Sequence, residues 1–341
     1  MPATADTPHP RIVSLLPAAT EIAAALGLER NLVGRSHECD FPATVTALPA
    51  LTATRIDPHG SSREIHEQVG RVLGQSATAP AAPPGNACGT AARGNAASGL
   101  FTLDIDRLTA LAPDVILTQA SCDVCAISDA DVAAAVRRSN APCRVVSLAP
   151  ASLDDLLRDI LAVGAATSSL PRAREVVARL RARIASVTHR TGTFTGRPRV
   201  AVLDWLDPPM AAGHWVPEMV HRAGGTDLLG RPGSPSHWIT WPEVAAADPD
   251  VVVLAPCGFP LDRVVAEAGS PAVRPHLEPL RAALEGRVYA VDGHHLFNRP
   301  GPRLVDSLEV LAEILHPGRF RFAANNTSGG YLRLSGFTPV T

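Results

Sequence analysis

The chain has 341 residues, of which 46% are hydrophobic, and its formal net charge is −2. This length suits two domains, and the near-neutral charge gives no electrostatic case for nucleic-acid binding. No stretch approaches the ~20 apolar residues of a membrane-spanning helix, and the first ten residues lack the features of a secretory signal. We therefore expect a cytoplasmic protein, or a periplasmic or cell-surface one if the start is truncated.

The chain begins with residues 1–10, which we expect to be disordered, and then alternates strands with helices. RIVSL (11–15) predicts a strand, followed by a turn at Pro17. An apolar helix is expected from Glu21 to Leu28, ending near Gly27. NLVGR (31–35) predicts the next strand.

A Pro/Gly-rich, aperiodic stretch interrupts this alternation at residues 75–100 and is typical of a flexible insertion. Order resumes at Phe101, where Asp104 is expected to cap a short helix that ends at Leu111. A β-branched run at 115–119 then predicts a strand. We expect the N-terminal lobe to span residues 11–150, which include this strand.

Helical periodicity dominates residues 151–196, with Pro171 suited to the first turn of a long helix. We expect this connector to join the first lobe to a C-terminal lobe at 197–318, which opens on a strand at 199–204. Residues 319–341 form a tail, in which YLRL (331–334) could add an edge strand.

The two lobes repeat one phrase. APDVILTQASC (112–122) and DPDVVVLAPC (248–257) each place a helix breaker, a buried strand and a cysteine in that order. Sequential strand–helix alternation with buried Val, Ile and Leu runs is typical of mainly parallel sheets covered by helices. The sequence therefore predicts an α/β protein with two similar lobes and ligand near the carboxyl ends of the strands.

Thiols and an imidazole form the first candidate site. His37 and Cys39 follow the 31–35 strand, and Cys122 and Cys125 follow the 115–119 strand. These four residues could converge on one metal ion as a Cys3His set. Two alternatives stay open: small buried residues that line a pocket wall, or a redox dithiol.

Aromatic residues form the second candidate site. All four tryptophans lie between residues 205 and 241, and indole faces stack well on flat ligands. Each tryptophan belongs either to the core or to the ligand cleft, and we expect Trp205 and Trp238 to face the cleft, with Trp215 a further candidate. The neighbouring His214 and His237 are candidates for a polar or axial contact with the ligand.

The remaining candidates follow strand ends. Cys257, Pro17 and His37 are further expected ligand contacts, and we interpret His294 and His295 as turn residues rather than a metal-binding pair. The sequence contains no nucleophile elbow, phosphate-binding loop or dinucleotide fingerprint, and no carboxylate pair or triad stands out. We therefore expect a binding protein and not an enzyme.

The chain resembles the iron-siderophore and vitamin B12 class of ABC-transporter substrate-binding proteins over roughly residues 11–318, apart from the insertion. The likeness is nearest to cobalamin-binding members and is carried by RIVSLLPAATEIAAALGLERNLVGRSHECDFP (11–42), LDIDRLTALAPDVILTQ, AGGTDLLG (223–230), ITWPEVAAADPDVVVLAPCG and RPGPRLVDSLEVLAEIL (299–315).

The resemblance implies the class III periplasmic-binding-protein fold, chelatase-like, with two Rossmann-like lobes joined by one long helix. It implies a monomer that binds a corrinoid (cobalamin-like) or other metal chelate between its lobes without catalysis. It also implies an ABC permease as partner, onto which acidic residues dock, and Asp106 and Glu218 stand at or near those positions.

Two features depart from the family pattern: the thiol-rich strand ends and the absence of a signal segment. They favour an alternative, in which the chain is a cytoplasmic metal- or metallocofactor-handling protein, or an enzyme, with a Cys/His site. A further alternative is a binding module for sensing, with no transport.

Overall fold

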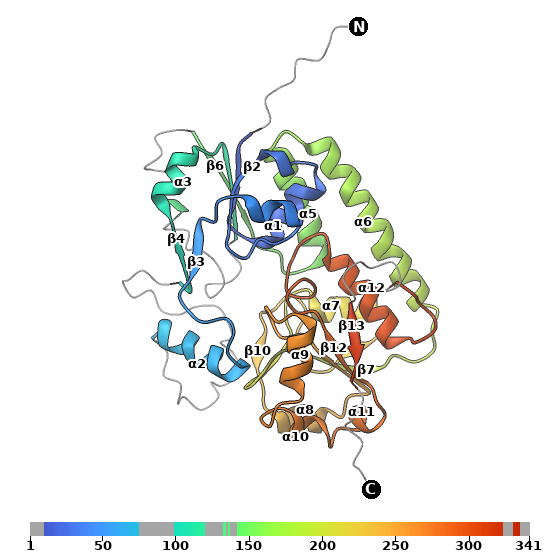
Figure 1. Ribbon diagram of the computed structural model, residues 1–341. Helices are drawn as coiled ribbons and strands as arrows, with labels where there is room; N and C mark the ends of the chain where they lie inside the picture. The colour runs from blue at the N-terminus through green and yellow to red at the C-terminus, as the bar shows by residue number, and fades with distance from the viewer. Residues whose placement is uncertain are drawn as a thin grey trace. The chain divides into compact units, whose positions relative to one another are not determined.

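The computed structural model describes residues 10–74, 99–119, 132–133, 136, 142–322 and 330–334. The chain divides into two compact units, coloured along the chain in Figure 1. The first unit contains Met1–Arg55, Ala97–Ala149 and Leu157–Ala178. The second contains Ile56–Ala96, Pro150–Leu156 and Arg179–Thr341.

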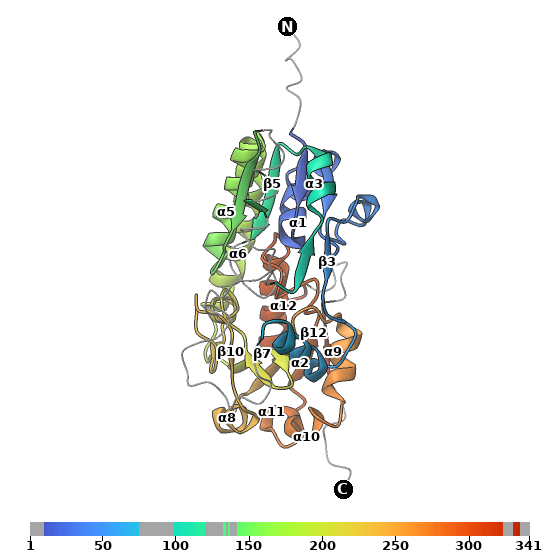
Figure 2. The same cartoon turned by 90° about the vertical axis from the view of Figure 1, so that its left-hand side faces the viewer.

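The first unit is built on a parallel sheet in the order β2-β1-β5-β6. Figure 2 shows α5 (Leu153–Ala166) on one side of β5 (Val115–Gln119) and α3 (Ile105–Leu111) on the other. A separate antiparallel pair, β3 with β4, lies outside this sheet. The strands and helices are β1 (Ile12–Ser14), α1 (Pro17–Ala25), β2 (Leu32–Arg35), β3 (Thr52–Thr54), β4 (Phe101–Leu103), α3 (Ile105–Leu111), β5 (Val115–Gln119) and β6 (Arg144–Leu148), with short 3-10 turns at Glu29–Asn31 and Ala43–Ala47.

Local sequence signals account for most of these boundaries. The Asp104 carboxylate accepts the backbone N–H of Arg107 at 2.9 Å, so this residue caps α3 as predicted. Helix α1 differs from the prediction, because Pro17 is its first residue and not part of a preceding turn. Proline fits this position because the first helical N–H has no intrahelical partner and the fixed φ of proline suits a helix.

Two helices connect the units, α5 (Leu153–Ala166) and α6 (Leu170–Thr191). The 22 residues of α6 make a rod of roughly 33 Å at ~1.5 Å per residue. The chain passes from the first unit to the second within this helix. The predicted long connecting helix is therefore present.

The second unit contains a larger sheet in the order β10-β8-β7-β11-β12-β13, with β9 beside β7. Its centre is parallel, and β8, β10 and β13 add antiparallel edges. The strands are β7 (Arg199–Leu206), β8 (Pro209–Ala211), β9 (Thr226–Asp227), β10 (His237–Trp238), β11 (Val251–Leu254), β12 (Val288–Val291) and β13 (Tyr331–Arg333). Strand β13 pairs with β12, which confirms the edge strand expected at YLRL.

The helices of the second unit include one from the first quarter of the chain. They are α2 (Ser62–Val72), α7 (Val216–Arg222), α8 (Trp241–Ala247), α9 (Leu261–Ala268), α10 (Arg274–Leu277), α11 (Arg281–Leu284) and α12 (Leu304–Leu315). Figure 2 shows α2 beside β7 and α9. The sequence placed this segment in the N-terminal lobe, but its contacts group it with the second unit.

Several expectations fall on other parts of the chain. Nearly all of the N-terminus that we expect to be disordered, nearly all of the insertion at 75–100 and much of the tail lie outside the described residues. Among the helices that are described, none combines the length and the apolar character needed to cross a membrane.

Candidate functional site

His37 follows β2 in the first unit, as predicted. Its Nδ1 lies 2.6 Å from the Thr52 Oγ1, and its ring meets Phe101 edge-on with 5.0 Å between centroids. Burial, and then the charge of Arg35, lower the pKa of His37 below its ordinary value. The imidazole is therefore neutral at neutral pH, which is the form that binds metals.

Cys39 lies deeper in the same unit, with 1% of its surface exposed. The Thr20 Oγ1 lies 3.0 Å from its Sγ and 2.8 Å from the Ser14 Oγ, so the thiol belongs to a buried polar network. Cys122 and Cys125 lie outside the described residues. The Cys3His metal site therefore stays a prediction.

The carboxyl ends of β7, β11 and β12 meet at one edge of the second-unit sheet, because these strands are parallel. Cys257 is exposed in the turn after β11, and its N–H donates to the Asp204 carbonyl at 3.0 Å. Gly293, in the turn after β12, lies so close that an added Cβ would be 2.1 Å from the Pro256 carbonyl oxygen. Glycine at this position lets the two turns pack together.

Asp292 organises the turn after β12. Its carboxylate accepts the backbone N–H groups of His294 at 2.9 Å and His295 at 2.8 Å. It also lies 2.7 Å from the His295 Nδ1. Burial opposes ionisation here, but the hydrogen bonds from His295 outweigh it and lower the pKa of Asp292. The two histidines thus lie in a turn, which presents two imidazoles. Their interpretation as turn residues rather than a metal-binding pair stays a prediction.

The loop that follows this turn contacts Trp215, the residue before α7. The Trp215 Nε1 donates to the Phe297 carbonyl at 2.6 Å, and the ring of His214 stacks on the indole at 5.5 Å and 28°. Both His214 (φ 51°) and Phe297 (φ 49°) adopt the left-handed conformation, which costs about 1–3 kcal/mol for a non-glycine residue. Strain on both sides of one indole is typical of a functional position.

The other tryptophans differ in exposure. Trp205 is 9% exposed, packs edge-on against Phe259 at 5.4 Å and lies within β7, not after it. Trp241 is equally buried and stacks on His276 at 5.3 Å. Trp238 is 40% exposed on β10, where the ring of His66 meets it edge-on at 4.8 Å. Of the two preferred ligand residues, Trp238 offers the accessible face.

Asp204 is a buried acid in β7, next to Trp205 in the chain. Asp204 is 7% exposed, and its Oδ2 accepts the Ser236 hydroxyl at 2.5 Å. Its Oδ1 has no hydrogen-bond partner among the described residues. Burial raises the pKa of Asp204 to about 7, although the Ser236 hydrogen bond opposes the shift. Next to Ser236, burial and then the charge of Arg231 lower the pKa of His237.

The two predicted docking acids have different surroundings. Asp106 is exposed in the first turn of α3. Glu218 accepts the backbone N–H of Leu153 at 3.0 Å and the Arg222 Nε at 2.7 Å. It therefore satisfies the N-terminus of α5 within the second unit. Docking of either acid onto a permease stays a prediction.

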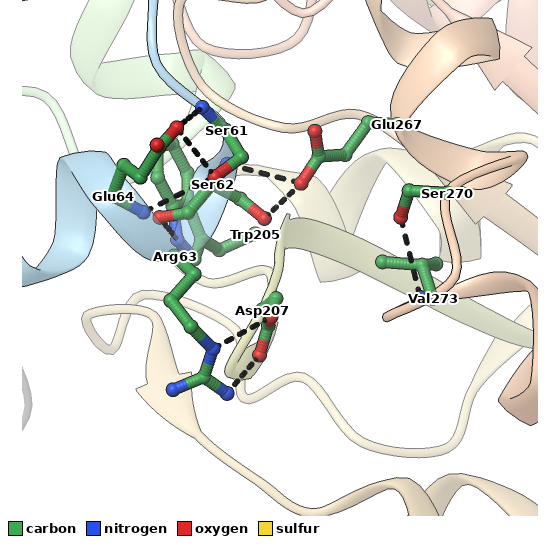
Figure 3. Close-up of polar contacts among 9 residues, drawn as sticks. All are labelled: Ser61, Ser62, Arg63, Glu64, Trp205, Asp207, Glu267, Ser270 and Val273. Atoms are coloured by element: carbon green, nitrogen blue, oxygen red, sulfur yellow. Dashed lines mark hydrogen bonds and ion pairs between the residues drawn. The ribbon is translucent and has the colours of Figure 1, made fainter.

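Sequence reasoning missed α2 and its residues Arg63 and His66. Figure 3 shows Arg63 reaching Asp207, and Ser62 lying between Trp205 and Glu267. The sequence carries a signal for this helix: Ser61 and Glu64 form a capping box in which each side chain bonds the backbone N–H of the other. Nothing local indicates what the helix packs against.

Comparison with solved structures supports the fold. A periplasmic vitamin B12 binding protein of Vibrio cholerae is 19% identical, with a TM-score of 0.62 over 90% of this chain and 97% of that chain. A periplasmic heme binding protein from Pseudomonas aeruginosa is 21% identical, with a TM-score of 0.65 over 91% and 94%. A periplasmic heme-binding protein from Roseiflexus sp. RS-1 is 23% identical, with a TM-score of 0.61 over 89% and 97%.

These neighbours confirm the expected class III fold. A comparison with curated protein sequences gives no match. The family described as periplasmic binding protein matches residues 96–293. Its members bind ligands without catalysis, in agreement with the sequence prediction. The chain therefore belongs to the periplasmic binding protein family, as the resemblance of its sequence indicates.

Proposed function

We propose that this protein is the substrate-binding component of an ABC importer and that its ligand is a tetrapyrrole metal chelate, a corrinoid or a haem. The similar structures include a vitamin B12 binding protein and a heme binding protein. The family favours the periplasm or cell surface over the cytoplasm, which was the other location expected from the sequence.

The observation that carries this proposal is the group of rings at the carboxyl edge of the second-unit sheet. His214 stacks on Trp215, and the carbonyl of Phe297 joins this pair to the turn that holds His294. The Arg299 Nη2 lies 2.9 Å from the His294 Nε2. Trp215 and Arg299 are themselves buried, so the half-buried imidazoles of His214 and His294 are the groups that this cluster offers to a ligand. Imidazoles suit a planar chelate with a coordinated metal.

The metal-handling alternative depends on His37, Cys39, Cys122 and Cys125. His37 is neutral and so suited to bind a metal. Cys39, however, would have to leave its contact with Thr20. We keep this site as a second proposal, with metal content of the purified protein, compared between wild type and Cys122→Ser, as its test. Metal-free wild-type protein would count against it.

Titration with cyanocobalamin and with haemin, followed by tryptophan fluorescence, tests the main proposal. We expect saturable quenching by at least one of them, weakened in His214→Ala. His276→Ala is the matched control, since it also removes a histidine stacked on a tryptophan, but at Trp241. Equal weakening in both variants would contradict the assignment of the site, and no quenching at tens of micromolar by either ligand would refute the proposed function.

A further inference from the structure

Helix α2 lies against Trp205 of the second unit. The Trp205 Nε1 donates to the Ser62 carbonyl at 3.1 Å, across 143 residues of sequence (Figure 3). Ile65 joins the core cluster that includes Trp205. Trp205 therefore has the only polar group of its side chain engaged by α2, and Ile65 of α2 belongs to the same apolar cluster.

Polar contacts hold the start of α2 in place. Arg63 pairs with Asp207 at the end of β7 through two bonds, Nε to Oδ2 at 2.9 Å and Nη2 to Oδ1 at 2.5 Å. The Ser62 N–H donates to the Glu267 Oε1 of α9 at 3.0 Å, and the Ser62 hydroxyl bonds the same oxygen. These contacts fix the helix end over the carboxyl end of β7 (Figure 3).

Arg263 of α9 holds the loop that leads into α2. Its guanidinium bonds the carbonyls of Pro58 and Gly60. The same group lies 3.6 Å above the ring of Phe259. The loop and the helix together, residues 57–72, form what we call the α2 strap.

Few apolar contacts hold the strap against the second unit, compared with its polar contacts. Of the 11 residues of α2, only Ser62 and Ile65 are buried. A helix this short is marginal on its own in water, so its stability depends on docking. An element held by a few polar contacts, one buried isoleucine and the partly buried Val69 opens at a lower free energy than the core strands beneath it.

We propose that the α2 strap is displaceable and that it must lift from the second unit before a ligand can reach Trp205. This inference rests on the proposed function, because it concerns access of that ligand to Trp205, one of the ligand contacts expected from the sequence. Lifting the strap frees the Trp205 N–H and removes Ile65 from the apolar cluster that contains the indole. Docking of the strap therefore competes with binding of the ligand. Because only the open protein binds, the apparent affinity for the ligand falls in proportion to the fraction of protein that is open.

Hydrogen exchange tests the strap without any ligand. We expect α2 amides to exchange at least about 100-fold faster than those of β7 in the wild-type protein. Equal protection of α2 and β7 would overturn the inference, because the strap would then open only when the whole unit unfolds. This readout stands even if neither probe ligand binds, a result that would refute the proposed function alone.

Ligand binding by Arg63→Ala tests the competition. Since Arg63 is more than half exposed, we expect cyanocobalamin or haemin, whichever the wild type binds, to bind about 5-fold tighter, equivalent to about 1 kcal/mol. Arg71→Ala, on the same helix, should bind as the wild type does. A variant that folds but binds equally or more weakly than Arg71→Ala would overturn the inference.

Discussion

Replacing Arg183 with alanine should destabilise the second unit by about 2 kcal/mol. The Arg183 guanidinium on α6 bonds Glu309 at 2.9 and 2.6 Å and Asp306 at 2.5 Å, both on α12. Burial lowers the pKa of Arg183, but these bonds outweigh it and raise the pKa. Losing one partner of a buried charge pair costs about 3–5 kcal/mol. Because the Arg183 side chain is 38% exposed, solvent reduces that penalty to about 2 kcal/mol.

Urea denaturation followed by tryptophan fluorescence measures this loss, since all four tryptophans lie in the second unit. Arg181→Ala is the matched control, because Arg181 is exposed on the same helix, and it should change the unfolding free energy by less than about 0.5 kcal/mol. If Arg183→Ala and Arg181→Ala unfold at the same urea concentration, the reasoning about the two carboxylates is wrong.

Three further predictions concern the carboxyl edge of the second unit. Burial raises the pKa of Asp204 to about 7, so the unfolding free energy should fall as pH rises from about 4 to about 7; Asp204→Asn should flatten this dependence in urea unfolding, and an unchanged slope would contradict it. Trp238→Ala should change the thermal midpoint little, given its exposure, but reduce fluorescence quenching by the ligand; unchanged quenching would remove Trp238 from the site. Gly293→Ala should cost about 1–3 kcal/mol by overpacking, and more than Gly269→Ala, where an added Cβ meets its nearest neighbours at an ordinary 3.6 Å; calorimetry giving the reverse order would contradict the packing of the two turns.

Local signals in the sequence were sufficient for much of the fold. The buried run after each Pro-Asp pair became a central parallel strand, β5 or β11. Asp104 caps its helix, and the long connecting helix is present. Each feature is encoded by residues close together in the chain, where propensity and periodicity act.

Long-range packing could not be predicted in the same way. Ser62 and Glu267 are 205 residues apart, and no local pattern links them. Trp205 shows a related difference: β7 continues to Leu206, so Trp205 lies within the strand and not after it. A strand that is two residues longer than expected places this indole beneath α2, where the Ser62 carbonyl accepts its N–H, instead of in a loop.

The central claim is that the chain binds a tetrapyrrole metal chelate, and equilibrium dialysis of the wild-type protein tests it most directly. Cyanocobalamin and haemin would each be dialysed against the protein, with bound ligand measured by its absorbance. We predict that at least one of them is retained at saturation with one molecule per chain. Retention of neither ligand at tens of micromolar would contradict the claim.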